Sequence, residues 1–213
     1  MAGLRDLGAG FVDLLYPPRC LTCGALAEPF CGGCRSQIEP VEADRELPHG
    51  IHAARSAGWH EGPLRTAVLR LKFERKTALA RPLGLLLAEQ LESAPWKPDA
   101  LVPVPIHWLR RLERGFNQSE LIAEQLSRAS GVPVHRLLRR TRYTLPQVGQ
   151  SRSHRAENLR GAFALGGRDA LRGARLALVD DVRTTGATLL ECTAVLRAAG
   201  ASRVYALTVT HDR

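Results

Sequence analysis

The chain has 213 residues, a formal net charge of +9 and a pI of about 10.0. This length suits one well-packed domain with a small appendage, and the charge favours anionic ligands such as phosphates or nucleic acids. No apolar run reaches the ~18 residues that a membrane-spanning helix needs. No basic segment leads into an apolar core as in a signal peptide, so we expect a cytoplasmic protein with no membrane span.

The first predicted element is a short amphipathic helix over residues 4–15. A helix lying on a membrane surface would need more basic residues on its polar face. Packing on the body of the protein is therefore the preferred interpretation. The apolar residues that recur at helical spacing are Leu4, Leu7, Phe11, Leu14 and Leu15.

Two CxxC pairs follow, Cys20 with Cys23 and Cys31 with Cys34, separated by seven residues. Four thiolates complete a closed tetrahedral Zn2+ site, which is structural because no coordination position stays open. We predict a zinc module within residues 1–40, too small to fold without its metal. Disulfides, a redox-active CxxC pair and an iron–sulfur cluster are the alternatives. The fifth cysteine, Cys192, is predicted to lie in the core.

Residues 41–62 contain proline, acids and histidines without clear periodicity, which predicts a linker. An α/β domain is expected over residues 63–213. It begins with predicted helices over 63–73 and 78–91, followed by a short buried strand over 100–104.

After this strand the sequence is dense in arginine up to a predicted helix that runs to Ser127. Residues 101–160 hold 11 Lys and Arg against 4 Asp and Glu, which is +7 of the net charge. The planar guanidinium group of arginine binds phosphate through two parallel hydrogen bonds. A glycine near a helix start leaves backbone N–H groups accessible to an anion. We therefore predict an anion site. A solvated basic surface is the alternative. The candidate residues are Arg110, Arg111, Arg114, Gly115, Asn117 and Gln118.

Residues 176–188 form the most informative stretch of the chain. An apolar, strand-like run ends at Asp180 and Asp181, and a loop of small and hydroxyl residues then leads into a helix. Such a loop lies where open α/β folds bind ligands, and the helix start offers N–H groups to a phosphate. The two carboxylates suit sugar hydroxyls or Mg2+. The pattern indicates a sugar-phosphate site, whose loop residues are Thr184, Thr185, Gly186, Ala187 and Thr188.

Alternation of strands and helices from residue 100 onward predicts an α/β fold with a mainly parallel sheet. The expected strands cover residues 100–104, 132–138, 175–180 and 203–209. A helix over 186–199 is expected to connect the last two strands.

The stretch from Leu176 to Thr188 resembles the 5-phosphoribosyl-1-pyrophosphate (PRPP) loop of type I phosphoribosyltransferases. Arg183 departs from that pattern, because most members carry an aliphatic residue there. Further motifs resemble the ComF family, which is associated with natural competence, the uptake of single-stranded DNA. They are Leu71-Lys72-Phe73, the Val-Pro-Val-Pro of 102–105, the Arg-Gly-Phe-Asn-Gln of 114–118, Arg142 to Gln147, and Arg155, Asn158, Gly161 and Phe163. The family's members also carry a four-cysteine module ahead of a phosphoribosyltransferase-like domain, and the resemblance covers about residues 18–210.

The resemblance implies a site for PRPP with Mg2+. Asp180 and Asp181 would be the catalytic residues and orient the ribose hydroxyls, and the loop of 184–188 would bind the 5-phosphate. A mobile hood over residues 140–158 would close on the pyrophosphate, with Gln147, Arg152, His154 and Arg155 as candidates. The pyrophosphate-binding residues implied are Arg114, Gly115, Asn117, Gln118 and Arg155.

Two classes of function follow from the sequence. The first is a phosphoribosyltransferase that acts on an acceptor no segment specifies. The second is a non-catalytic accessory module of the DNA-uptake machinery that binds PRPP or single-stranded DNA. Under the second class the basic middle region and the zinc module would contact single-stranded DNA or a DNA-uptake helicase.

Overall fold

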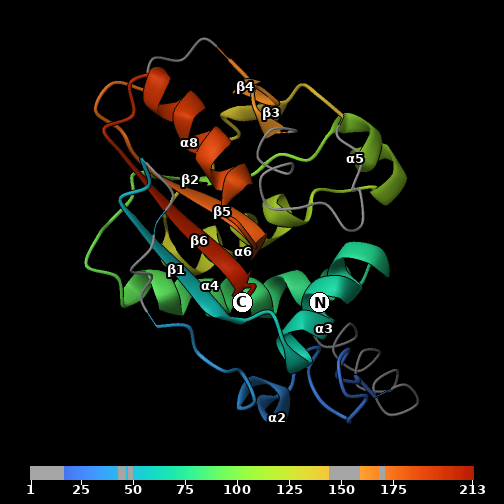
Figure 1. Ribbon diagram of the computed structural model, residues 1–213. Coiled ribbons are helices and arrows are strands. Elements are labelled where there is room, and N and C mark those ends of the chain that lie inside the picture. The colour runs from blue at the N-terminus through green and yellow to red at the C-terminus, as the bar shows by residue number, and fades with distance from the viewer. Residues whose placement is uncertain (1–16, 43–46, 48–49, 144–158, 168–170) are drawn as a thin grey trace, which may run out of the picture.

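A four-stranded sheet forms the centre of the computed structural model (Figure 1). Its strand order is β1-β6-β5-β2, and all neighbouring strands run parallel. The strands are β1 (Ala53–Trp59), β2 (Ala100–Pro103), β5 (Arg175–Arg183) and β6 (Arg203–His211). The structure describes residues 17–42, 47, 50–143, 159–167 and 171–213. The predicted parallel-sheet α/β class is therefore confirmed.

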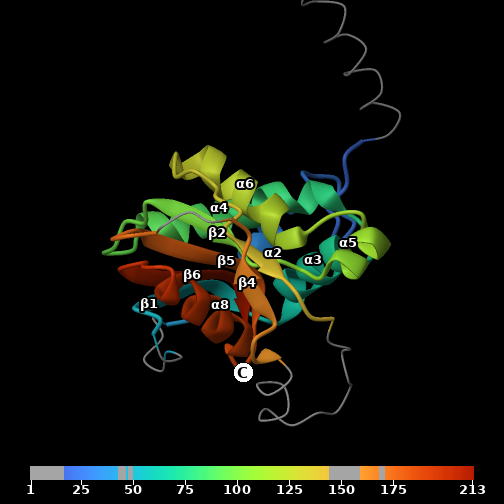
Figure 2. The same cartoon turned by 90° about the horizontal axis from the view of Figure 1, so that it is seen from above.

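Helices cover both faces of this sheet, so that it separates two apolar cores (Figures 1 and 2). Along β5, Ala177 and Val179 belong to one core, whereas Leu176 and Leu178 belong to the other. This alternation follows from the two-residue period of a strand, and burial on both faces explains the nearly continuous apolar run.

The larger core lies under three helices, α3 (Gly62–Phe73), α4 (Ala80–Glu92) and α6 (Gln118–Ser130). A 3-10 turn over Thr77–Leu79 leads directly into α4. The helices predicted at 63–73 and 78–91 are confirmed. Gly84 of α4 lets this helix approach α6 closely, because a Cβ there would lie 2.5 Å from Gln125 Cβ.

The opposite face carries α8 (Ala187–Ala198), which connects β5 to β6 as predicted. Next to α8 lies a small antiparallel pair, β3 (Leu138–Arg140) and β4 (Phe163–Leu165). The strand predicted over 132–138 is wrong. Val134 forms only an isolated bridge with Leu101, because the chain leaves the main sheet and pairs with β4 instead.

The N-terminal cysteine region packs on the same larger core. Its short helix α2 (Gly32–Arg35) lies beside α3, and Cys20, Phe30 and Cys34 are buried in the cluster that includes Leu64. Arg70 of α3 donates a hydrogen bond of 2.7 Å to the Leu21 carbonyl. Apolar contact and hydrogen bonding therefore join this region to α3.

Strand β1 falls inside the range for which the sequence predicted a linker. Its sequence, Ala-Ala-Arg-Ser-Ala-Gly-Trp, has small residues and weak strand propensity. Pairing with β6 along Ala53 to Trp59 nevertheless makes it the edge of the sheet. The helix predicted over 4–15 lies outside the described residues. No helix in the described ranges combines the length and apolarity of a membrane span.

Candidate functional site

The four N-terminal cysteines converge on one point. Their Sγ atoms all lie within 4.8 Å of one another. The Cys20–Cys34 and Cys23–Cys31 separations are both 3.7 Å. A tetrahedron with Zn–S bonds of ~2.3 Å has edges of about 3.8 Å, whereas a disulfide is only ~2.05 Å long. The geometry therefore matches a structural Zn2+ site.

Hydrogen bonds to the sulfur atoms surround this metal centre. Thr22 donates from Oγ1 to Cys34 Sγ at 2.9 Å, and the backbone N–H of Cys31 points at Cys20 Sγ at 3.4 Å. The N–H of Cys34 points at Cys31 Sγ at 3.4 Å. Such donors stabilise thiolates and orient metal ligands.

A second candidate site is a pocket of about 380 Å³ at the carboxyl edge of the sheet. It lies where β2 and β5 end, which is the usual ligand position in open α/β folds. Residues from α3, β5, the loop before α8 and the segment after β2 line it. Of the residues proposed from sequence, it brings together Asp180, Asp181, Thr184, Thr188, Arg110, Arg114 and Gln118.

The acid pair sits inside β5 rather than after it, because this strand continues to Arg183. Both carboxylates are buried. Asp180 accepts a 2.9 Å hydrogen bond from Ser119 Oγ, at the start of α6. Asp181 forms an ion pair of 2.9 Å with Lys72 Nζ, from the end of α3. Successive residues of one strand thus meet partners from two different helices.

One member of the buried pair, Asp180, has a raised pKa. Burial and, after it, the negative charge of Asp181 raise the pKa of Asp180 to about 7, against the opposing effects of Lys72 and of the hydrogen bond from Ser119. A proton on Asp180 at neutral pH relieves repulsion between adjacent carboxylates. A bound cation would relieve the same repulsion in place of the proton, and the carboxyl oxygens can also bind sugar hydroxyls.

The loop of 184–188 presents an open helix start to the pocket. Gly186 is the N-cap of α8 with φ 74°, a left-handed conformation that glycine adopts without a Cβ clash. Because Gly186 has no side chain, it cannot cap the N–H groups that follow it. Thr184 and Thr188 line the pocket, while Thr185 Oγ1 accepts a 3.4 Å contact from the Ala187 N–H. This arrangement suits a phosphate.

The segment after β2 forms a short helix, α5 (Trp108–Arg114), which was not predicted from the sequence. Arg114 hydrogen-bonds Gln118, and both line the pocket. Asn117 is buried, caps α6 through Ser119 N–H and donates 3.0 Å to the Val104 carbonyl. Its side chain therefore positions α6. Gly115 ends α5 and lines a separate surface hollow with Trp108.

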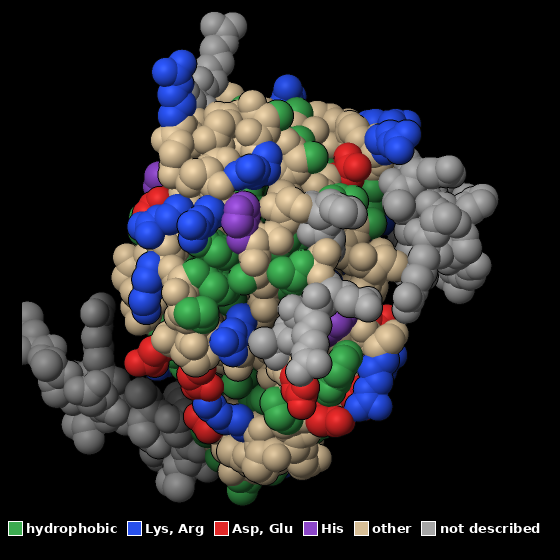
Figure 3. All heavy atoms as spheres, turned by 60° about the vertical axis from the view of Figure 1, so that its left-hand side comes forward, with side chains coloured by type: hydrophobic (Ala, Val, Ile, Leu, Met, Phe, Trp, Pro, Cys, Tyr) green, Lys and Arg blue, Asp and Glu red, His purple; other side chains and the backbone are tan. Residues whose placement is uncertain are grey.

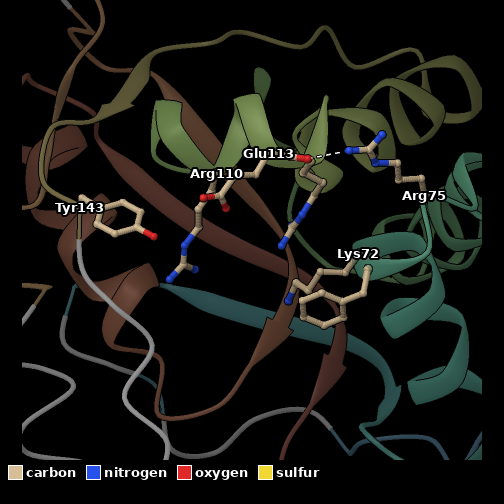
Figure 4. Close-up of a pocket in the computed structure, with 7 residues that line it drawn as sticks. Lys72, Arg75, Arg110, Glu113 and Tyr143 are labelled. Carbon is tan, nitrogen blue, oxygen red and sulfur yellow. Dashed lines mark hydrogen bonds between the residues drawn. The ribbon is translucent and has the colours of Figure 1, made fainter.

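A wider basic hollow, which we call the rim, adjoins the pocket (Figure 4). Arg110 and Lys72 point into it from α5 and α3, while Arg75 bonds the Glu113 carbonyl at 2.7 Å. Arg110 lies 5.8 Å from the centre of the Tyr143 ring. The rim and the pocket lie side by side, because Lys72, Phe73, Arg110 and Arg114 line both. The rim is lined by Lys72, Phe73, Arg75, Arg110, Glu113, Arg114 and Tyr143.

The pocket residues that were not singled out as site residues from sequence include Lys72, His60 and Arg140. Lys72 belongs to a motif noted only for its resemblance, and its ion pair spans more than one hundred residues of sequence. His60 follows β1 in the expected linker. Arg183, the departure from the family pattern, is buried and hydrogen-bonds His211 Nδ1 at 2.7 Å. Arg155 and the other predicted hood residues, Gln147, Arg152 and His154, lie outside the described residues.

The fold and the two sites define an α/β protein with a mainly parallel sheet and an N-terminal four-cysteine zinc centre. Solved structures to which the chain is similar include glutamine PRPP amidotransferase from Bacillus subtilis, at 18% identity and a TM-score of 0.45. That match covers 66% of this chain and 30% of the other. Adenine phosphoribosyltransferase from Trypanosoma brucei matches at 11% identity and a TM-score of 0.45, covering 82% and 87%.

Sequence relatives then give the family. Competence protein F of Haemophilus influenzae is 32% identical over 197 residues, covering 88% of this chain and 82% of the relative. Competence protein ComFC of Bacillus subtilis is 34% identical, covering 76% and 75%. DNA utilization protein YhgH of Escherichia coli K12 is 37% identical over 148 residues, which span 64% of that protein. Residues 11–45 match the double zinc ribbon domain family. The chain belongs to the competence protein F (ComF) family.

Proposed function

We propose that this protein binds PRPP with Mg2+ in the pocket and transfers its phosphoribosyl group to an acceptor, in a role linked to DNA uptake. One observation carries the proposal: a phosphate-binding helix start, a buried acid pair and a basic cluster line one cavity of about 380 Å³. These are the three chemistries that a sugar carrying phosphates at both ends requires. The names of the relatives, competence protein and DNA utilization protein, support the link to DNA uptake.

In this proposal each part of PRPP has its own subsite. The 5-phosphate lies at Thr184 to Thr188 and the start of α8, the ribose at the acid pair, and the pyrophosphate against Arg114 and Lys72. As pyrophosphate leaves, the anomeric carbon gains positive charge, and the nearby carboxylates stabilise it. Arg114 and Lys72 stabilise the charge that develops on the leaving group.

The acid pair also fits Mg2+. Carboxylate oxygens are the ligands that this ion prefers, and it commonly joins one or two carboxylates to substrate phosphates. Asp180 and Asp181 would hold it, and it would neutralise charge on the pyrophosphate. Lys72 Nζ lies 2.9 Å from Asp181 Oδ2 and forms an ion pair with this buried carboxylate.

Calorimetric titration of PRPP, with and without Mg2+, tests this proposal. We expect Mg2+-dependent binding to the zinc-loaded protein and loss of binding in an Asp180→Asn/Asp181→Asn variant. The matched control is Asp99→Asn, because Asp99 pairs with Arg175 at the opposite edge of the sheet. Failure of the intact protein to bind PRPP would refute the proposed function.

A second candidate function is binding of single-stranded DNA without catalysis, which the composition of the rim favours. Arginines lie there beside exposed aromatic rings: Phe73 is 68% exposed and its ring centre lies 5.6 Å from the Arg114 guanidinium, and Tyr143, beside Arg110, is 40% exposed. Bases stack on such rings while cations bind phosphates. On the face drawn in Figure 3, by contrast, Lys and Arg side chains are scattered among acidic and hydrophobic ones.

Fluorescence anisotropy with a labelled oligonucleotide tests this second function. We expect affinity to fall steeply with salt, since phosphate contacts release counterions. Phe73→Ala should weaken binding by about 1–3 kcal/mol if a base stacks on that ring. Leu26→Ala is a suitable control, because Leu26 is also an exposed apolar residue but lies in the zinc module. Equal binding by both variants would exclude the rim as a DNA-binding surface.

A further inference from the structure

His60 occupies a position in the pocket that the subsites proposed above leave unused. It follows β1 directly, and its backbone N–H donates 2.7 Å to the His211 carbonyl, which fixes it at the carboxyl edge of the sheet. Its half-buried side chain lines the same pocket as Asp180 and Asp181. The hydrogen bonds around His60 therefore show which of its ring nitrogens carries a proton.

The hydrogen bonds of Thr210 determine which nitrogen of His60 carries the proton. The Thr210 hydroxyl lies 3.2 Å from the Asp181 carbonyl, which can only accept, so the hydroxyl proton is donated there. Thr210 Oγ1 also lies 2.8 Å from His60 Nδ1 and must therefore accept from it. In neutral His60, Nδ1 thus carries the proton and Nε2 carries a lone pair. This tautomer is assigned from the network of hydrogen bonds.

The surroundings of His60 favour this neutral form. Burial lowers the pKa of His60, and the positive charges of Arg65 and Lys72 act in the same direction. The carboxylates of Asp212 and Asp181 act oppositely but do not reverse the shift. The hydrogen bond of the ring to Thr210 uses Nδ1, and within the described residues Nε2 makes none. The lone pair is therefore available to a ligand in the pocket.

We propose that His60 Nε2 is the general base that accepts a proton from the acceptor during phosphoribosyl transfer, an inference that rests on the function proposed above. The anomeric C–O bond breaks and pyrophosphate leaves with the electron pair. A bond forms between the anomeric carbon and the acceptor, and the acceptor's proton passes to Nε2. The acceptor class is thus a neutral nucleophile that attacks through an N–H or O–H group, because an anionic nucleophile would need no base.

Two simple nucleophiles test this role without knowledge of the natural acceptor. Water must lose a proton on attacking PRPP, whereas azide need not. In His60→Asn, the amide can still donate to Thr210 but the basic nitrogen is absent. We expect pyrophosphate release with water to fall about 100-fold or more, azide to restore most of that loss, and PRPP affinity to stay within about twofold of that of the unmodified protein.

Three further variants make the test specific. Thr210→Val removes the acceptor that fixes the tautomer, so it should also slow the reaction with water, while Thr210→Ser should retain most of the rate. His135→Asn, at an exposed position outside the pocket, should change nothing.

Failure of PRPP to bind the intact protein would refute the proposed function itself. PRPP binding with equal water rates for the intact protein and His60→Asn would overturn only the role of His60. If release is too slow to measure, nitrogen-15 NMR still decides the matter, because a proton on Nε2 instead of Nδ1 at neutral pH contradicts the assignment.

Discussion

The zinc centre and the pocket are assembled in opposite ways. The ligands of the zinc centre all come from residues 20–34, and local turns bring their sulfur atoms within 4.8 Å of one another. The pocket draws its residues from 60–188, and only the parallel pairing of the strands places them at one edge. The first site is therefore specified by spacing, and the second by topology.

This difference predicts how each site should respond when one of its residues is substituted. The chain segment around the zinc centre folds only with its metal, so removing one ligand should release the zinc and unfold that segment. Removing one residue from a pocket carried by a rigid sheet leaves the scaffold in place and changes only the interaction of that residue. Three predictions test the contrast, beginning with the largest effect.

Cys31→Ser should have the largest effect on the protein. Loss of zinc should unfold the module, and because Cys20, Phe30 and Cys34 share a core cluster with Leu64, α3 should lose stability too. We expect a fall in Tm on the order of 10 °C by calorimetry. A colorimetric assay of bound zinc should show the loss of metal.

The matched control for this prediction is Cys192→Ala, which also removes a buried thiol but lies in α8 against the other core. It should cost stability by leaving a small cavity, while zinc content stays unchanged. An unchanged Tm in Cys31→Ser would mean that the module and the α/β domain are energetically independent.

Substitutions in the acid pair should change the free energy of unfolding by an intermediate amount. The change should have opposite signs at Asp180 and Asp181. Unfolded Asp has a pKa near 3.9, whereas burial raises that of folded Asp180 to about 7. Between these values the native state binds the extra proton, so stability falls as pH rises from about 4 to about 7. Asp180→Asn should remove this fall and stabilise the protein at pH 8 by on the order of 2 kcal/mol.

Asp181→Asn should instead destabilise the protein, because Lys72 loses the carboxylate 2.9 Å away. The loss should be about 1–3 kcal/mol, since the Lys72 side chain is 21% exposed and can recover some hydration. Urea unfolding at pH 5 and pH 8 measures both variants. The same sign for both at pH 8 would contradict the assigned division of charge between the two acids.

The smallest effect is expected at Gly186, where φ is 74°. Gly186→Ala forces alanine into the left-handed region and should cost about 1 kcal/mol of stability. Gly131 after α6 has φ 75° and no atom within 4 Å of an added Cβ, so Gly131→Ala should cost the same. Only Gly186→Ala should also weaken PRPP binding in calorimetry, because it alone alters the phosphate loop.

Much of the fold could be predicted from local sequence signals. Continuous apolar runs identified β5 and β6, and helical periodicity identified α3 and α4. The strand β1 could not be predicted, because its short run of small residues is ordered by pairing with β6. The 132–138 prediction failed for a related reason: Val134 contacts the main sheet only through a single bridge to Leu101, and regular pairing begins at Leu138, with β4.

The sequence by itself determined the metal centre and the chemistry of the phosphate loop, because residues close in the chain meet through short turns. Only the tertiary structure decided that Lys72 neutralises Asp181, that Ser119 holds Asp180 and that Thr210 fixes the proton on His60. These contacts join residues far apart in the sequence. Their geometry depends on strand order and on how helices pack across the sheet, and a linear pattern does not specify either.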